Sequence, residues 1–177
     1  MNWEDRRVFA VVVTGAPGAG KTASLIGLAD ALIDDQIAHA AIDVDEVAWA
    51  YPFPDLDGRC ARLVAAWGAH REAGHDLLLV GEVVESSEHL AQILDAVGAD
   101  DHLLVLLEAT PSTMRERIVA REPPGWSGLE HLLGEVERYA ASLPRLDGVH
   151  VVCNTERLTP DEVAVRIRAA RPDRLGG

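Results

Sequence analysis

The sequence is poor in lysine, aromatic residues and cysteine, and it has no long hydrophobic run. It holds a single lysine among 177 residues, and its net charge at pH 7 is −13. Affinity for DNA or RNA comes from many clustered cations that neutralise phosphates, so this charge balance argues against a nucleic-acid partner. No apolar run approaches the roughly 20 residues that a bilayer-spanning helix needs. We therefore expect no nucleic-acid and no membrane partner.

The two cysteines, Cys60 and Cys153, lie far apart and lack the C-x-x-C spacing of metal and redox sites. This pattern indicates small buried side chains in a reducing compartment, although a disulfide between them remains possible. The N-terminal stretch Met1–Arg7 contains no apolar signal region, which predicts a cytoplasmic location. The length and the 48% hydrophobic content suit a single domain over residues 1–177.

A phosphate-binding loop is the clearest motif in the chain. Residues 15–22 read G-A-P-G-A-G-K-T, a complete G-x-x-x-x-G-K-[ST] pattern between the apolar run 8–13 and a helix-like segment. Its glycines let backbone N–H groups point at phosphate oxygens, and the following helix adds its positive N-terminal end. Lys21, the sole lysine, supplies a compact ammonium for the β- and γ-phosphates, and the Thr22 hydroxyl is placed for Mg²⁺. The motif predicts a bound nucleoside triphosphate.

Apolar runs alternate with helix-like segments through the rest of the chain, which is typical of a parallel sheet covered on both faces. Together with the loop after the first strand, this predicts an α/β, three-layer P-loop NTPase fold: a five-stranded parallel sheet with helices on both faces. In the predicted helix 58–72, Ala61, Val64, Ala65 and Trp67 are expected to face inward. The expected strands cover residues 8–13, 37–42, 77–80, 102–107 and 149–153.

Acidic residues follow three of the predicted strands. Asp43 and Asp45 follow the second strand, where the ligands of such folds sit. A phosphoryl-acceptor hydroxyl needs a base, and Mg²⁺ needs oxygen ligands. We predict Asp45 as the acceptor base and Asp43 as an indirect metal contact; the alternative is that both cap the next segment. Glu82 resembles a Walker-B carboxylate but could instead hold a polar acceptor group, and Glu108 is expected to be structural.

Arginines cluster on the predicted helix before a short lid at residues 122–128. Arg117 and Arg121 are four residues apart and share a helix face, so both can serve a transferring phosphoryl group or a base. Arg115 is expected to be an exposed, charge-balanced residue. Arg138, on the next helix, is a weaker candidate that could face back across the lid.

An aromatic segment lies between the second strand and the next helix. Trp49, Tyr51 and Phe53 alternate there with prolines and an alanine, which predicts irregular structure. The three rings either line an acceptor pocket or form a small satellite core.

These motifs resemble the small P-loop kinases, which include nucleoside-monophosphate, shikimate, gluconate, adenylylsulfate and antibiotic-phosphorylating kinases. The resemblance covers nearly the whole chain and is carried by the phosphate loop, the Asp-x-Asp at 43–45 and the L-x-A-x-P-x-x-M-x-x-R-x-x-x-R-E segment over 107–122. It implies ATP with Mg²⁺, with Arg117 packing near adenine and Arg121 as a lid arginine reaching the phosphates. It implies Asp45 as the acceptor-side base, and Asn154 and Thr155 in the loop that approaches the nucleotide base.

The leading hypothesis is an ATP-dependent phosphotransferase that acts on a small metabolite, nucleotide or antibiotic and works as a monomer or homodimer. A non-catalytic ATP-binding module, or a nucleotide-dependent switch acting through a protein partner, is the alternative. The segment 154–157 lacks the N-K-x-D pattern that reads guanine, which disfavours a GTPase. The expected catalytic residues are Lys21, Asp45 and Arg121, and the expected metal residues are Thr22 and Asp43. The expected nucleotide-binding residues are Gly15, Ala16, Pro17, Gly18, Ala19, Gly20, Lys21, Thr22, Ala23, Arg117, Asn154 and Thr155.

Overall fold

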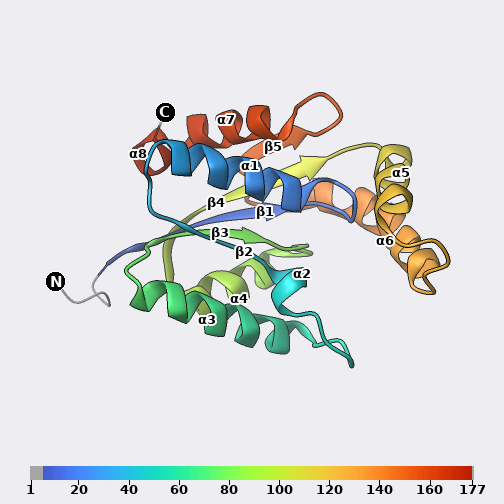
Figure 1. The fold of residues 1–177 in the computed structure, drawn as a ribbon, viewed down its shortest axis with the longest axis horizontal. Coiled ribbons are helices and arrows are strands. Elements are labelled where there is room, and N and C mark those ends of the chain that lie inside the picture. The colour runs from blue at the N-terminus through green and yellow to red at the C-terminus, as the bar shows by residue number, and fades with distance from the viewer. Residues whose placement is uncertain (1–5, 177) are drawn as a thin grey trace.

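A five-stranded, all-parallel sheet forms the centre of the protein (Figure 1). The computed structural model describes residues 6–176. The strand order is β2-β3-β1-β4-β5, so β2 and β3 lie on one side of β1 and β4 and β5 on the other. Where the direction of strand addition reverses, beside β1, such a sheet has a crevice at its carboxyl ends. The phosphate loop follows β1 at this crevice. The strands are β1 (Val8–Thr14), β2 (Ala40–Asp43), β3 (Leu77–Gly81), β4 (Ala99–Glu108) and β5 (Val151–Asn154).

Helices cover both faces of the sheet, and two helices stand beyond the carboxyl ends of the strands. In Figure 1, α1, α7 and α8 lie on one face and α3 and α4 on the other, while α5 and α6 extend past the strand ends. The three layers of the predicted fold are therefore present. The helices are α1 (Lys21–Asp34), α2 (Val44–Val47), α3 (Leu56–Glu72), α4 (Ser87–Val97), α5 (Pro111–Arg121), α6 (Leu129–Ser142), the 3₁₀ turn η2 (Leu143–Arg145), α7 (Pro160–Ala170) and α8 (Pro172–Leu175).

The sheet separates two hydrophobic cores. Every residue of β1 is buried, and its side chains alternate between the two faces, Phe9 to one and Ala10 to the other. The core that holds Phe9 is the larger and includes Leu28 of α1, Ile118 of α5 and Ile167 of α7. A central strand buried on both faces is held rigidly, so the loop that follows it has a fixed starting point.

Helix starts near the strand ends are fixed by local capping. Asp43 accepts the Asp45 N–H to begin α2, and Asp55 accepts the Gly58 N–H to begin α3. Thr110 caps α5, whose first residue is proline, and the capping box predicted at Thr159 opens α7. These short polar residues tie the ends of the strands directly to the helices that carry the site.

The predicted fold is confirmed, but two local predictions are wrong. The second strand begins at Ala40, because Gln36 adopts a left-handed conformation and the Ile37 N–H bonds the Leu32 carbonyl at 2.8 Å, closing the end of α1. On α3, residues 61, 64 and 65 are exposed. The buried residues are Leu63, Trp67 and Arg71, because the Arg71 guanidinium is hydrogen-bonded to backbone carbonyls and therefore takes an inward position.

The structure also bears on the cysteines and on membrane insertion. Cys60 is half-buried, Cys153 is buried, and both are free thiols. In the described part of the chain, no helix has the length and apolar content that crossing a bilayer requires.

Candidate active site

The phosphate loop wraps around a buried lysine. The Lys21 side chain is 8% exposed, and its Nζ donates to the Gly15 carbonyl at 3.1 Å. Gly18 and Gly20 have φ values of +79° and +99°, a backbone region that residues other than glycine rarely adopt. A Cβ at Gly18 would also lie 2.5 Å from the Met114 carbonyl oxygen of α5. The glycines are thus required for both the curl of the loop and its contact with α5.

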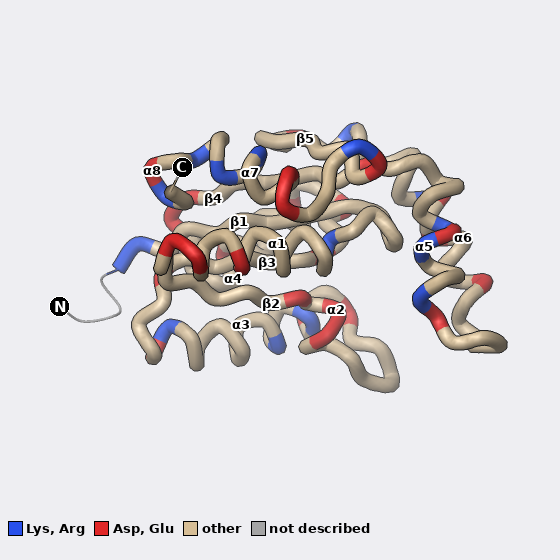
Figure 2. The backbone as a smooth tube through the Cα atoms, turned by 45° about the horizontal axis from the view of Figure 1, so that its top comes forward, with Lys and Arg blue, Asp and Glu red and all other residues tan. Residues whose placement is uncertain are grey.

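The ammonium group of Lys21 faces a ring of charged side chains. Burial lowers the pKa of Lys21, while the carboxylates of Asp45, Asp43 and Glu82 act to raise it and Arg121 acts to lower it. The predicted lysine, acids and lid arginine are therefore close enough to interact electrostatically. Figure 2 shows the acidic positions of α2 at the end of β2. They lie at the same end of the sheet as α5 and α6.

Thr22 and Asp43 form a direct pair beside the lysine. The Thr22 hydroxyl donates to Asp43 Oδ2 at 2.6 Å, and Asp43 Oδ1 accepts the Asp45 N–H at 3.1 Å. Because the hydroxyl proton is held by Asp43, the lone pairs of the Thr22 oxygen are directed away from it. One hydroxyl oxygen and one carboxylate are hard oxygen donors of the kind that Mg²⁺ accepts together with water and phosphate oxygens. Among residues 6–176 no cluster of three or more His, Cys, Asp or Glu forms an all-protein metal site.

Asp45 and Glu82 are joined by an arginine that the sequence patterns did not single out. Arg59 Nη2 donates to Asp45 Oδ1 at 2.9 Å and to Glu82 Oε1 at 2.5 Å, and Arg59 Nε donates to Glu82 Oε2 at 3.2 Å. Glu82 is 2% exposed, whereas the Asp45 side chain is 54% exposed. Arg59 therefore balances a buried carboxylate and orients an accessible one.

We expect Glu82→Gln to remove a pH-dependent loss of stability. Burial raises the pKa of Glu82 above its ordinary value near 4.5, although Arg59 opposes the shift. Because the folded state binds the proton more tightly, the parent keeps its full stability below about pH 4.5 and loses some as pH rises through the folded-state pKa. The variant lacks this loss, so the free energy of unfolding of the variant should rise relative to that of the parent as the pH increases over that interval.

Chemical denaturation at a series of pH values measures this difference. Glu46→Gln, at an exposed position on α2, is the control and should track the parent. Parallel pH curves for the parent and Glu82→Gln would show that the buried carboxyl is not the source of the effect.

Arg117 ties three segments together on the nucleotide side. Its Nη1 donates to the Gly18 carbonyl at 3.2 Å and to Thr155 Oγ1 at 2.9 Å, and its Nη2 donates to the Thr155 carbonyl at 2.8 Å. The Thr155 hydroxyl in turn donates to the Ala19 carbonyl at 2.9 Å, and Asn154 Oδ1 accepts the Glu156 N–H at 3.0 Å. The structure thus brings Arg117, Asn154 and Thr155 together beside the phosphate loop.

The remaining arginines have other partners. Arg121 Nη2 contacts Glu122 at 2.5 Å, and its side chain is 63% exposed at the start of the lid. Arg115 pairs with Glu137 of α6 at 2.9 Å, which fits the charge-balanced role expected of it. Arg138 pairs with Glu85, which follows β3, at 3.0 Å and with Glu135 of its own helix at 2.5 Å.

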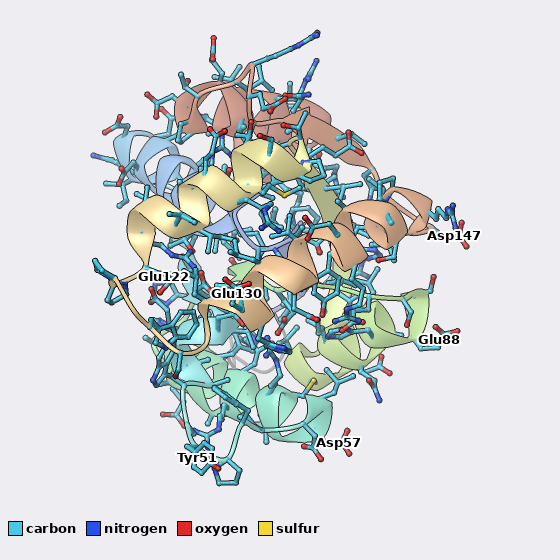
Figure 3. All side chains as sticks on the ribbon, turned by 90° about the vertical axis from the view of Figure 1, so that its right-hand side faces the viewer. Tyr51, Asp57, Glu88, Glu122, Glu130 and Asp147 are labelled. Carbon is cyan, nitrogen blue, oxygen red and sulfur yellow. The ribbon has the colours of Figure 1, made fainter. Side chains whose placement is uncertain are left out.

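The aromatic segment is exposed. Trp49, Tyr51 and Phe53 are 80%, 92% and 76% exposed, so the satellite-core alternative is wrong. Figure 3 looks onto the edge where the strands end: Tyr51 lies at its outer margin and points into solvent, while Glu122 and Glu130 mark the two ends of the lid. The rings are therefore free to contact a ligand or a partner.

Two structural residues of the site carry no local signal. Arg59 lies in the first turns of α3 and reaches Asp45 of α2 and Glu82, which directly follows β3. Glu156 accepts hydrogen bonds from Thr110 at 2.7 Å and from Thr113, which ties the start of α5 to the segment after β5. Both residues act through contacts with segments far away in the sequence. Their local sequence surroundings resemble those of other arginines and glutamates in the chain, so no local pattern distinguishes them.

The fold and this site define a P-loop protein with the architecture of the small kinases, and solved structures share it. Among the similar structures are APS kinase from Mycobacterium tuberculosis in complex with AMPPNP and APS (TM-score 0.65, 17% identity, 93% of this chain and 97% of that chain) and a gluconokinase from Sinorhizobium meliloti 1021 (0.60, 18%, 96% and 95%). Shikimate kinase from Acinetobacter baumannii in complex with shikimate is also similar (0.58, 16%, 97% and 97%).

These likenesses establish that the chain has the small P-loop kinase fold over nearly its whole length, as the motifs indicated. Comparison of the sequence with protein-family models and with curated proteins finds no match. The activity is therefore argued from the residues of the site.

Proposed function

We propose that the protein is an ATP-dependent phosphotransferase that moves the γ-phosphoryl group of ATP to a hydroxyl of a small molecule. The observation that carries the proposal is the placement of an accessible carboxylate, Asp45, opposite the buried Lys21 of a complete phosphate loop. A loop that only binds nucleotide does not require an oriented, exposed acid on its far side. Phosphoryl transfer does, because the acceptor must be positioned and deprotonated.

The nucleotide side is assigned to the loop and the arginines of α5. Backbone N–H groups of the loop other than those of Pro17, which has none, and Ala19, which bonds the Ala16 carbonyl, hold the phosphates together with the N-terminus of α1 and the Lys21 ammonium. Arg117 and Thr155 shape the place for the nucleotide base, because they already join the loop to the segment after β5. Arg121 is exposed, and within residues 6–176 its one ion-pair partner is its sequence neighbour Glu122, so it can turn toward the phosphates.

Asp45 is assigned as the acceptor base. The acceptor hydroxyl donates its proton to the Asp45 carboxylate as its oxygen forms the new bond to the γ-phosphorus. The bond from that phosphorus to the β–γ bridging oxygen breaks, and ADP leaves with the electron pair. Arg59 holds one Asp45 oxygen at 2.9 Å, which orients the carboxylate for this step.

The hydroxyl of Thr22 and the carboxylate of Asp43 fit Mg²⁺, and these two residues would hold it. Bound there with ATP, it would supply positive charge that neutralises phosphate oxygens.

We expect Thr22→Val to raise the Mg²⁺ concentration needed for half-maximal ADP formation by about tenfold or more, because the hydroxyl ligand is lost. Thr22→Ser keeps the hydroxyl and should need the parent concentration. An unchanged requirement in Thr22→Val, measured by Mg²⁺ titration at fixed ATP, would remove Thr22 from the metal site.

A coupled ADP-release assay with a panel of acceptors tests the proposed function. The panel contains sugars, nucleosides, nucleoside monophosphates and aminoglycosides, each supplied with Mg²⁺ and ATP. Acceptor-dependent ADP release, with the phosphorylated product found by mass spectrometry, is the expected result. ATP binding by calorimetry with no ADP release across the panel would favour a non-catalytic nucleotide-binding module instead.

A further inference from the structure

Two arginines flank the place where the acceptor is expected, and each already has two acidic partners. We define the acceptor side as Asp45, Arg59, Glu82, Glu85, Glu135 and Arg138 with the carboxyl ends of β2 and β3. Arg59 binds Asp45 and Glu82, and Arg138 Nη1 binds Glu85 at 3.0 Å. The second partner of Arg138 is Glu135, whose Oε2 lies 2.5 Å from its Nη2.

Carboxylates outnumber guanidinium groups on the acceptor side. Two arginines contact four acids there, so the local charge is negative even when the buried Glu82 carries a proton. The Tyr139 hydroxyl donates to the other Glu85 oxygen at 2.9 Å, which fixes that carboxylate in place. A ligand that brings a further negative charge here meets like charges at short range.

Releasing Arg59 to bind an anion would leave a buried acid without its cation. Glu82 is 2% exposed, and besides Arg59 it accepts a hydrogen bond from the Val83 N–H at 2.8 Å. An uncompensated buried carboxylate is strongly unfavourable. Arg59 is therefore committed to Glu82 and Asp45, and it is not available as an anion receptor.

The exposed rings of Trp49, Tyr51 and Phe53 lie in the chain segment between Asp45 and Arg59. Aromatic faces carry negative potential, so they attract cations and the C–H faces of sugar rings and disfavour anions. The aromatic rings and the acidic side chains therefore both favour a neutral or cationic ligand over an anionic one.

We propose that the acceptor carries no negative charge: it is a neutral or cationic polyhydroxylated molecule such as a sugar, an amino sugar or a nucleoside. This inference rests on the proposed phosphotransferase function and adds the chemical class of its acceptor. Hydroxyl groups of such a molecule can donate to Asp45 Oδ2, and to the remaining lone pairs of the Glu85 oxygens, without disturbing either arginine.

Acceptors of similar size that differ in charge test the proposal. Glucosamine, glucose and gluconate form one series, and uridine with uridine monophosphate forms a pair. In the ADP-release assay we expect the non-anionic members to have at least about tenfold higher kcat/KM than their anionic counterparts, because the acidic side disfavours a further negative charge. Equal or higher kcat/KM for gluconate and for the monophosphate would overturn the proposal.

A variant of the acceptor side sharpens the test. Glu85→Gln removes one carboxylate and frees part of Arg138, so the kcat/KM ratio of glucose to gluconate should fall about fivefold, the effect of one near charge in a water-like medium. Glu88→Gln, an exposed acid three residues further along, is the matched control and should leave the ratio unchanged. A ratio that is equal in all three proteins would count against the proposal.

Failure of the function and failure of the charge inference can be separated. If no compound releases ADP, the phosphotransferase proposal fails, and the charge of the acceptor side is then measured directly with a cationic and an anionic nitroxide of similar size. We expect the ratio of cationic to anionic relaxation enhancement at the Trp49 indole N–H and the Asp45 amide to exceed the average over other exposed amides. A ratio at or below that average would overturn the inference.

Discussion

Lys21→Ala is expected to lower kcat/KM for ATP about 100- to 1,000-fold, the usual effect of removing one preorganised charge-stabilising donor. The ammonium is buried within the loop and interacts electrostatically with Asp43, Asp45 and Glu82, so it would neutralise phosphate charge where screening by water is weak. ATP affinity, measured by calorimetry, should fall together with turnover. No other lysine exists in the chain to take over this role.

Two further variants serve as controls for the Lys21→Ala prediction. Lys21→Met keeps most of the side-chain volume and removes a buried charge, so it should fold at least as well as the parent and lose the same activity. Arg115→Ala removes an arginine that is paired with Glu137 on α6 and should keep the parent activity. If Lys21→Ala or Lys21→Met bound and turned over ATP like the parent, the loop would not be the site of the reaction.

Asp45→Asn is expected to lower kcat about 100- to 10,000-fold, the range for loss of a positioned general base. The Kd for ATP should stay at the parent value, because Asp45 belongs to the acceptor side. Asparagine keeps an oxygen that can accept from Arg59, so the local structure is preserved while the proton acceptor is lost. Single-turnover kinetics with a responsive acceptor separates the chemical step from binding.

The neighbouring acid provides the matched control for that variant. Glu46 is exposed on the same short helix, so Glu46→Gln changes the charge of α2 by the same amount and should turn over at the parent rate. Equal losses in both variants would indicate a general charge effect, and a parent rate in Asp45→Asn would assign the base elsewhere.

The parts of this protein that could be predicted from sequence are those specified by short, local patterns. The phosphate loop is one continuous segment, and its contacts follow from glycine placement and from the helix start at Lys21. The strands were recognisable because a parallel sheet with both faces covered requires continuous apolar runs, as in β1. The Asp43–Asp45 pair followed from its place directly after such a run.

The contacts that complete the site join segments far apart in the chain. Arg59 reaches Glu82 across 23 residues, and Arg117 reaches Gly18 across 99. Neither distance leaves a periodic or compositional trace in one sequence. The inward face of α3 was missed for a related reason: Arg71 is buried through hydrogen bonds to distant carbonyls, and a search for apolar spacing excludes arginine.

The triple attachment of Arg117 determines where the lid can bend. Because this side chain holds α5 against both Gly18 and Thr155, the first two turns of the helix form one rigid body with the phosphate loop. Any rotation of the lid that leaves the loop in place must start after this anchor, at the end of α5, where Glu122 becomes extended ahead of Pro123 and Pro124. We therefore expect the predicted lid to move about the end of α5, one turn beyond Arg117, where Arg121 can change partners while Arg117 keeps its contacts.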